Sequence, residues 1–420
     1  MAYNLFVTFL LVFCFPVFGP LNSAYIAVLL AIMKLCCCGG INRLVRLYRN
    51  TYIKTLIISS LLMTLLCALW TILMGVNDFS LTSAFFSLFV GLWMGIIVAA
   101  SLNYDNYDND FFEKLVVNLF VIQAIISIMA FVLPSVREFI HHFQFENDAE
   151  KSEEAYAGFR GLAMSGRLFF EFAATCGLIA FVQFKRIINK PTAPIAEYIK
   201  LFLIIVCGFF AGRTSMIGTA LGFLYLILYK GTIKKKIRII GSFLLILMSS
   251  VTVAVLIMPR DILTFVTEHF LPWVFDLFIK FHESGSTEDS ASFNRLNEMY
   301  KYVDITINEW IYGSGRYMSV DGGYYKSVDG GFIRHLLYWG VIGSFFSIVY
   351  SLLYYIRPYF KSHNRNDKLY ILLLLAYTLL VHYKGDLAPT SRFFHVPLVF
   401  LMLSYVFNLN PVKTSARNGN

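Results

Sequence analysis

The stretch TLIISSLLMTLLCALWTILMG, residues 55–75, contains no charged side chain. A helix of about 20 apolar residues crosses the hydrocarbon core of a bilayer, so this stretch is long enough to span one. Similar stretches recur along the 420 residues, of which 58% are hydrophobic and 15% charged. An ordinary soluble domain carries roughly 25% charged residues. The sequence therefore predicts an all-α polytopic membrane protein.

Hydropathy predicts about twelve transmembrane helices. The first apolar stretch follows no basic segment and has no small-residue cleavage site, which favours a membrane span over a signal peptide. The spans are expected near residues 4–19, 21–38, 55–75, 83–102, 114–134, 167–184, 199–211, 214–229, 239–258, 332–356, 369–384 and 393–408.

The orientation follows from the basic residues, which gather in alternate short connections. Lys and Arg cluster at 34–54, 185–200, 230–238 and 357–368. The positive-inside rule places these connections in the cytoplasm, and both termini with them. The net charge of +9 is thus explained by topology, and nucleic acid is not expected as a partner.

This topology divides the chain into four regions and leaves two loops on the outer face. The longer loop is the place where a water-soluble ligand could be held, and it contains the short repeat Ser319–Gly323 and Ser327–Gly331. The regions are 1–258, spans one to nine with a smaller outer loop at 135–166; 259–331, the large outer loop between spans nine and ten; 332–408, spans ten to twelve; and 409–420, a cytoplasmic tail.

Charged side chains at the edges of spans are costly and usually functional. Arg213 stands out, because it lies between two short apolar segments and its planar fork suits phosphate oxygens. The structural alternative is an arginine that extends to the membrane interface or pairs with Glu171. The other charged residues of this kind are Arg160, Arg167, Arg334, His335 and Arg392. His335 is also explained as an interfacial packing residue.

Two motifs resemble the O-antigen polymerase and ligase superfamily, the Wzy-like membrane glycosyltransferases. In DGGFIRHLLYWGVIG, residues 329–343, the spacing of Asp329, Phe332, Gly340 and Gly343 is similar to the family pattern that ends the large outer loop. GRTSMIG, residues 212–218, looks like the family's Arg-Thr corner between two spans. A weaker likeness is Arg160-Gly161 before the sixth span.

The resemblance implies a repeat-unit polymerase that joins undecaprenyl-diphosphate-linked oligosaccharides at the periplasmic face of the bacterial inner membrane. Asp329 is then the base that orients the acceptor hydroxyl, and Arg213 stabilises the leaving diphosphate. Expected contacts to the diphosphate or sugar are Arg160, Arg167, Arg316, Arg334 and His335. Neither a metal nor a cofactor is expected, and the bilayer, a chain-length regulator and a flippase of the same pathway are the expected partners.

Two other functions remain open at this point. A ligase of the same superfamily would move the finished glycan to lipid A-core, although its members usually carry His at the position of Asp329. A flippase or transporter for the lipid-linked sugar is disfavoured, because transporters commonly show paired halves with charges at the midplane. No nucleotide-binding loop or protease motif is found in the sequence.

Overall fold

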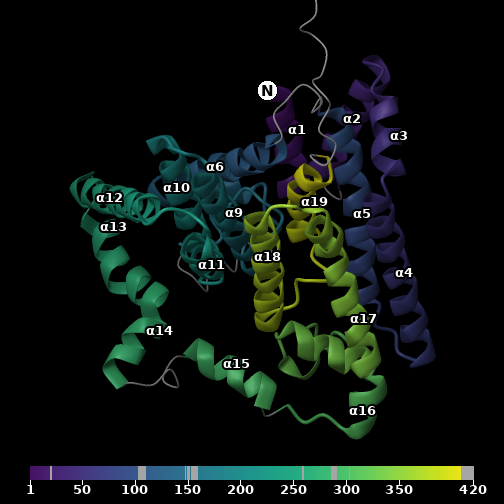
Figure 1. The fold of residues 1–420 in the computed structure, drawn as a ribbon. Helices are drawn as coiled ribbons and strands as arrows, with labels where there is room; N and C mark the ends of the chain where they lie inside the picture. Colours follow the sequence, from purple (N-terminus) through teal and green to yellow (C-terminus); the bar gives the residue numbers. More distant parts are fainter. Residues whose placement is uncertain are drawn as a thin grey trace, which may run out of the picture.

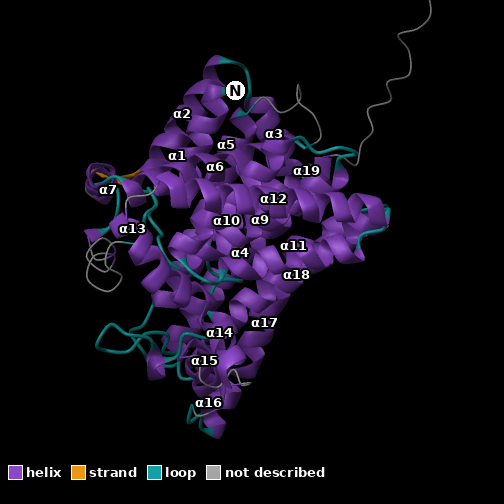
Figure 2. Cartoon of the chain, turned by 90° about the vertical axis from the view of Figure 1, so that its left-hand side faces the viewer, coloured by secondary structure: helices purple, strands orange, loops and turns teal. Residues whose placement is uncertain are grey.

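The computed structural model describes residues 1–407 except 19–20, 103–109, 147, 149–151, 153–158, 258–259, 285–290 and 302. The described chain is all-α apart from a short antiparallel ribbon of β1 (Pro16–Phe18) and β2 (Leu21–Asn22) (Figure 2). The predicted tail at 409–420 lies outside these residues.

Twelve described helices overlap the twelve predicted apolar segments, with bounds that differ by several residues in places (Figure 1). They are α1 (Ala2–Phe13), α2 (Ser23–Cys37), α4 (Thr51–Leu73), α5 (Ser80–Ser101), α6 (Phe111–Val132), α9 (Phe170–Asn189), α10 (Ile195–Ala211), α11 (Ser215–Leu228), α12 (Ile233–Ile257), α17 (Gly331–Lys361), α18 (Arg365–Lys384) and α19 (Arg392–Phe407).

The chain is a helical membrane protein with several apolar helices. Within the described part of the chain, five helices, α4, α5, α6, α12 and α17, are long and apolar enough to cross a membrane. A sixth span would be the pair of α2 and α3 (Ile41–Arg49), which bend by 113°. Several other segments are shorter, and α9 and α18 carry charges near their ends. The count of about twelve spans therefore stays a prediction.

Helix α9 lies at the centre of the bundle. Its residues from Phe172 to Ile188 are all buried, and it packs on α6, α10, α11, α18 and α19. A Cβ at Gly218 of α11 would lie 1.9 Å from the carbonyl oxygen of Gly177. This close approach requires glycine and holds α11 against α9.

The C-terminal end of α9 lies beyond residue 184, where the sequence predicts the span to end. The helix continues to Asn189 and buries Lys185 and Arg186. The prediction that both residues lie in an exposed cytoplasmic connection is therefore wrong about their exposure. Lys185 Nζ lies 2.6 Å from Glu113 Oε1 of α6, and Arg186 Nη1 lies 3.1 Å from Asp110. These ion pairs let the basic residues be buried.

The predicted large loop, 259–331, is short-helical. It contains α13 (Arg260–Phe265), the π-helix η2 (Val266–Phe270), α14 (Leu271–Ser284), α15 (Ala291–Lys301), α16 (Ile307–Tyr312) and the short 3-10 helix η3 (Tyr325–Ser327). Both views place α15 and α16 at the end of the molecule away from the N-terminus (Figures 1 and 2). The segment returns to the bundle through α16, which packs on α17.

Candidate functional site

A cavity of about 1040 Å³ opens where several helices end. The C-terminal ends of α1, α10 and α18 meet the N-terminal ends of α9, α11 and α19 there. Thr214, the residue before α11, Glu171 of α9 and Arg392 of α19 are all part of its lining. Helix N-termini carry partial positive charge and C-termini partial negative charge, so with three of each at the cavity the helix ends largely offset one another and the side chains set its charge.

The cavity brings together five of the seven residues predicted for the site. Asp329, Arg213, Arg160, Arg167 and Arg334 all line it, although they are distant in sequence. Further basic residues in the lining are Arg295, Lys384 and Arg392, and the acidic residues are Asp148, Glu171, Asp329 and Asp386. Arg316 is exposed and lies outside the lining, and His335 is buried behind it. The cavity thus contains an excess of cations.

Arg213 and Arg160 share one aromatic ring. Both guanidinium groups lie over Trp273 of α14, with their carbons 5.1 Å and 4.9 Å from the ring centroid. Arg160 also donates to the carbonyl oxygen of Ala211, at 2.7 Å from Nη2. Arg213 Nη1 pairs with Asp276 Oδ2, one helical turn after Trp273. The expected alternative partner, Glu171, instead pairs with Arg167 Nε at 3.6 Å.

Asp329 lies at the mouth of the cavity, directly before α17. Its Oδ2 accepts from Arg295 Nη2 at 2.8 Å, and the side chains are 35% and 68% exposed, respectively. A solvent-exposed pair of this kind holds its carboxylate only weakly, so substrate could displace Arg295. The carboxylate is therefore accessible to a ligand in the cavity.

The glycines and the aromatic residue of the Asp329 motif have structural roles in α17. Phe332 packs on the His382 ring, with 4.6 Å between centroids. Gly340 has a φ of +66° and interrupts the helix, and a Cβ there would lie 2.1 Å from Ile311 O of α16. Gly343 lies directly under the Trp339 ring. The motif thus fixes the loop helix α16 against α17.

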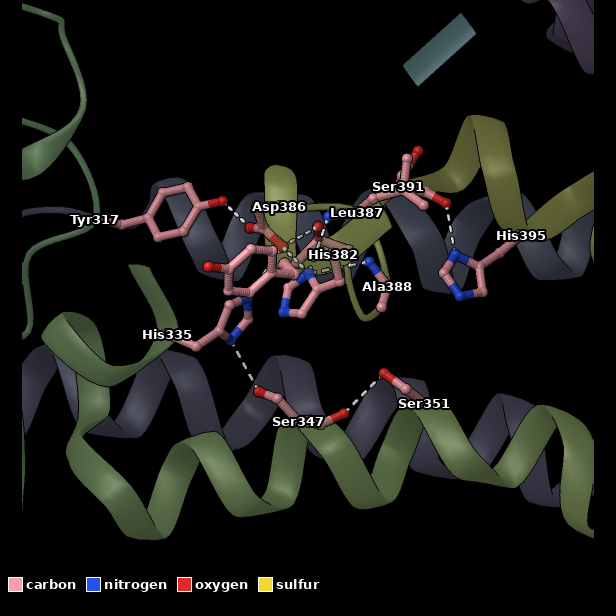
Figure 3. Close-up of polar contacts among 12 residues, drawn as sticks. Tyr317, His335, Ser347, Ser351, His382, Asp386, Leu387, Ala388, Ser391 and His395 are labelled. Carbon is pink, nitrogen blue, oxygen red and sulfur yellow. Dashed lines mark hydrogen bonds and ion pairs between the residues drawn. The ribbon is translucent and has the colours of Figure 1, made fainter. Parts of the chain in front are cut away.

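His335 and Asp386 form the centre of a buried network behind the cavity (Figure 3). His335 Nε2 lies 3.1 Å from Asp386 Oδ1, and Nδ1 lies 2.9 Å from Ser347 Oγ. Thr390 Oγ1 donates to Asp386 Oδ1 and the Tyr317 hydroxyl donates to Asp386 Oδ2. Burial raises the pKa of Asp386, but His335, His382 and Arg334 outweigh it and hold the pKa well below its usual value.

His335, His382 and Asp386 also have metal-ligand atoms within 4.8 Å of one another. His382 Nδ1, however, accepts hydrogen bonds from the backbone nitrogens of Leu387 at 3.2 Å and Ala388 at 3.3 Å. Nδ1 of His382 thus accepts from these N–H groups, which places the ring proton on Nε2. In this arrangement the cluster ties α17, α18 and the connection before α19 together by hydrogen bonds.

Sequence reasoning missed Lys384, the last residue of α18, and Asp386, in the short connection between α18 and α19. Two ionisable residues next to Gly385, between two apolar segments, were the available signal. Nothing in the sequence indicated that Trp273 would reach Arg160 and Arg213, because α14 and the α10–α11 corner are far apart in the chain.

No protein-family model, no curated protein and no solved structure matches this chain. The family resemblance therefore rests on the motifs and on the layout of the chain.

Proposed function

We propose that the chain is a membrane glycosyltransferase that polymerises lipid-linked oligosaccharide repeat units. The hydroxyl oxygen of an acceptor sugar attacks C1 of the donor's first sugar, and the bond from C1 to the diphosphate oxygen breaks. Undecaprenyl diphosphate leaves with the bonding electron pair, and the hydroxyl proton passes to a base. The new C1–O bond joins the donor glycan to the acceptor.

The observation that carries this proposal is the convergence of cations on one large cavity. Arg160 and Arg213 both contact the ring of Trp273, and their charges also act on Lys384. A leaving diphosphate needs fixed positive charge where its negative charge develops, and these arginines supply it once the phosphate oxygens displace Asp276 from Arg213. The lining is thus suited to a diphosphate.

Asp329 is the candidate base. It lines the same cavity as Arg213, and its ion pair with Arg295 can open to admit an acceptor sugar. A carboxylate within hydrogen-bond reach of the attacking hydroxyl orients it and accepts its proton. His335 is buried and bonded to Asp386 and Ser347, so its role in this proposal is to position the cavity wall.

The proposal includes a bilayer with about twelve spans, both termini in the cytoplasm and the cavity facing the periplasm of a bacterial inner membrane. Support comes from the position of the cavity at the helix ends away from Met1, where the 259–331 segment also lies. Lipid-linked substrates, with a flippase to deliver them and a chain-length regulator, are the corresponding partners.

A ligase that transfers glycan to lipid A-core would use the same diphosphate chemistry and is the second candidate. The lipopolysaccharide of a strain deleted for this gene separates the two on a gel. Core with one repeat unit and no ladder supports a polymerase, whereas core without any repeat supports a ligase. An unchanged ladder would contradict both.

A further inference from the structure

The guanidinium group of Arg334 lies between two tyrosine rings on one wall of the cavity. Its central carbon is 3.7 Å from the centroid of Tyr317 and 3.8 Å from that of Tyr324. Both distances are well within the range of cation–π contacts. The Arg334 side chain is buried, with 6% of the residue exposed, and it lines the cavity.

The first copy of the sequence repeat builds this arrangement. Met318 and Tyr324 form an antiparallel β-bridge, and the turn between them closes with a hydrogen bond of 2.8 Å from Ser319 N to Gly323 O. Gly322 has a φ of +84°, which a residue with a side chain rarely adopts. The bridge thereby places Tyr317 and Tyr324 on the two faces of Arg334.

A carboxylate from another part of the chain fixes the base of this turn. Asp78, between α4 and α5, accepts from the backbone nitrogens of Tyr317 at 2.5 Å and Met318 at 2.6 Å. The Tyr317 hydroxyl donates to Asp386. Tyr317 is therefore fixed both at its backbone nitrogen and at its hydroxyl group, which preorganises the Arg334 guanidinium.

One buried donor of Arg334 has no partner in the described part of the protein. Nε is buried and has no hydrogen-bond partner there, and Nη2 lies 3.8 Å from the weak acceptor Met318 Sδ. Asp386, whose charge acts on Arg334, already accepts from His335, Thr390 and Tyr317. A buried cation without a directly bonded anion is costly, which indicates that a ligand provides the anion.

We propose that Arg334 binds the carboxylate of an acidic sugar in the oligosaccharide substrate, an inference that rests on the proposed function. Tyrosine rings cover both faces of the guanidinium, so a ligand can approach only at its edge, where the N–H groups point. A carboxylate accepts two parallel hydrogen bonds in that plane. The diphosphate is assigned to Arg160 and Arg213, which contact Trp273 of α14 rather than the tyrosine pair. Arg334 is thus a specificity-determining residue.

Thermal unfolding of the purified full-length protein, in lipid nanodiscs at constant ionic strength, tests this inference. The probes are sodium glucuronate, glucose as its uncharged counterpart, and pyrophosphate. Glucuronate is expected to raise Tm of the wild type more than glucose does. Arg334→Lys keeps the charge but loses the fork, so the glucuronate affinity is expected to fall at least about tenfold while pyrophosphate still stabilises it. Arg213→Lys is expected to lose affinity for pyrophosphate and to keep its affinity for glucuronate.

Tyr324→Ala provides a second variant that leaves the arginine in place. It is expected to weaken glucuronate binding, whereas Tyr312→Ala, which removes an exposed tyrosine of α16, is expected to leave it unchanged. Equal stabilisation by glucuronate and glucose in the wild type would overturn the inference. So would loss of both glucuronate and pyrophosphate binding in Arg334→Lys, since Arg334 would then belong to the diphosphate site. Pyrophosphate binding without glucuronate binding refutes only this inference and leaves the proposed function standing.

Discussion

The guanidinium of Arg213 lies 3.2 Å from the carboxylate of Asp276, although the two residues are 63 positions apart. Asp276 belongs to α14, in the segment between the ninth and tenth predicted spans. Its carboxylate pairs with the arginine that we propose binds the diphosphate. Substrate must therefore compete with this internal carboxylate.

Replacing Asp276 by Asn should strengthen the binding of pyrophosphate. Both side chains are partly exposed, so the ion pair is worth about 1 kcal/mol or less, and removing the competing charge should improve the affinity by about fivefold or less. Isothermal titration calorimetry of the purified protein measures this change. Glu283→Gln is the matched control, because Glu283 pairs with Lys280 on the same helix and does not line the cavity. Weaker binding by Asp276→Asn would mean that Asp276 supports the site.

Arg213→Lys should reduce polymer formation by at least about tenfold, because a point charge cannot replace a bidentate fork. Membrane insertion should be unchanged, since the positive charge stays at the same corner. Immunoblots of membrane fractions and lipopolysaccharide gels measure the two effects. Arg260→Lys, an exposed arginine of α13, serves as the control and should retain the ladder. A normal ladder in Arg213→Lys would refute the assigned role.

Asp386→Asn should destabilise the protein by about 3 kcal/mol, because the buried carboxylate accepts hydrogen bonds from three side chains. The expected readout is a lower Tm for the purified protein. Asp321→Asn, in the exposed turn 319–323, should leave Tm unchanged. An unaltered Tm in Asp386→Asn would show that the network does not hold α17 to the α18–α19 connection.

Asp78 should make stability dependent on pH. Burial raises the pKa of Asp78, but hydrogen bonds from Ser80, Met318 and Tyr317 outweigh it and leave the pKa below its ordinary value of 3.8. A lowered pKa means that the ionised group stabilises the fold above pH 3.8, and that this stability is lost as the pH falls through the folded-state pKa. The Tm advantage of the wild type over Asp78→Asn should therefore shrink at acidic pH. A constant difference across pH would contradict this.

The positions of the apolar helices were predictable, because each predicted span contains a long uncharged stretch. The boundary of α9 was not, because Lys185 and Arg186 are buried by partners from α6 and the residues before it, which hydropathy does not consider. The shorter helices do not meet the criteria of length and apolar composition for crossing a membrane, so hydropathy alone does not establish them as spans.

The predicted site was found in part for a similar reason. Arg213 and Asp329 were recognisable because a charge at the edge of a span needs an explanation. Trp273 and Asp386 gain their roles only through contacts between distant segments, and Tyr324 gains its role through the turn that folds it back onto Arg334. Arg316 resembled the other loop arginines in sequence, yet its side chain lies away from the cavity lining.

The most direct test of the central claim is the lipopolysaccharide ladder of a deletion strain that carries either the wild-type gene or Asp329→Ala. Glu298→Ala is the control, because it removes an exposed carboxylate of α15 that does not line the cavity. The proposed mechanism predicts that wild type and Glu298→Ala restore the ladder, while Asp329→Ala, present in the membrane at the normal level, gives core with a single repeat unit. A full ladder with Asp329→Ala would contradict it.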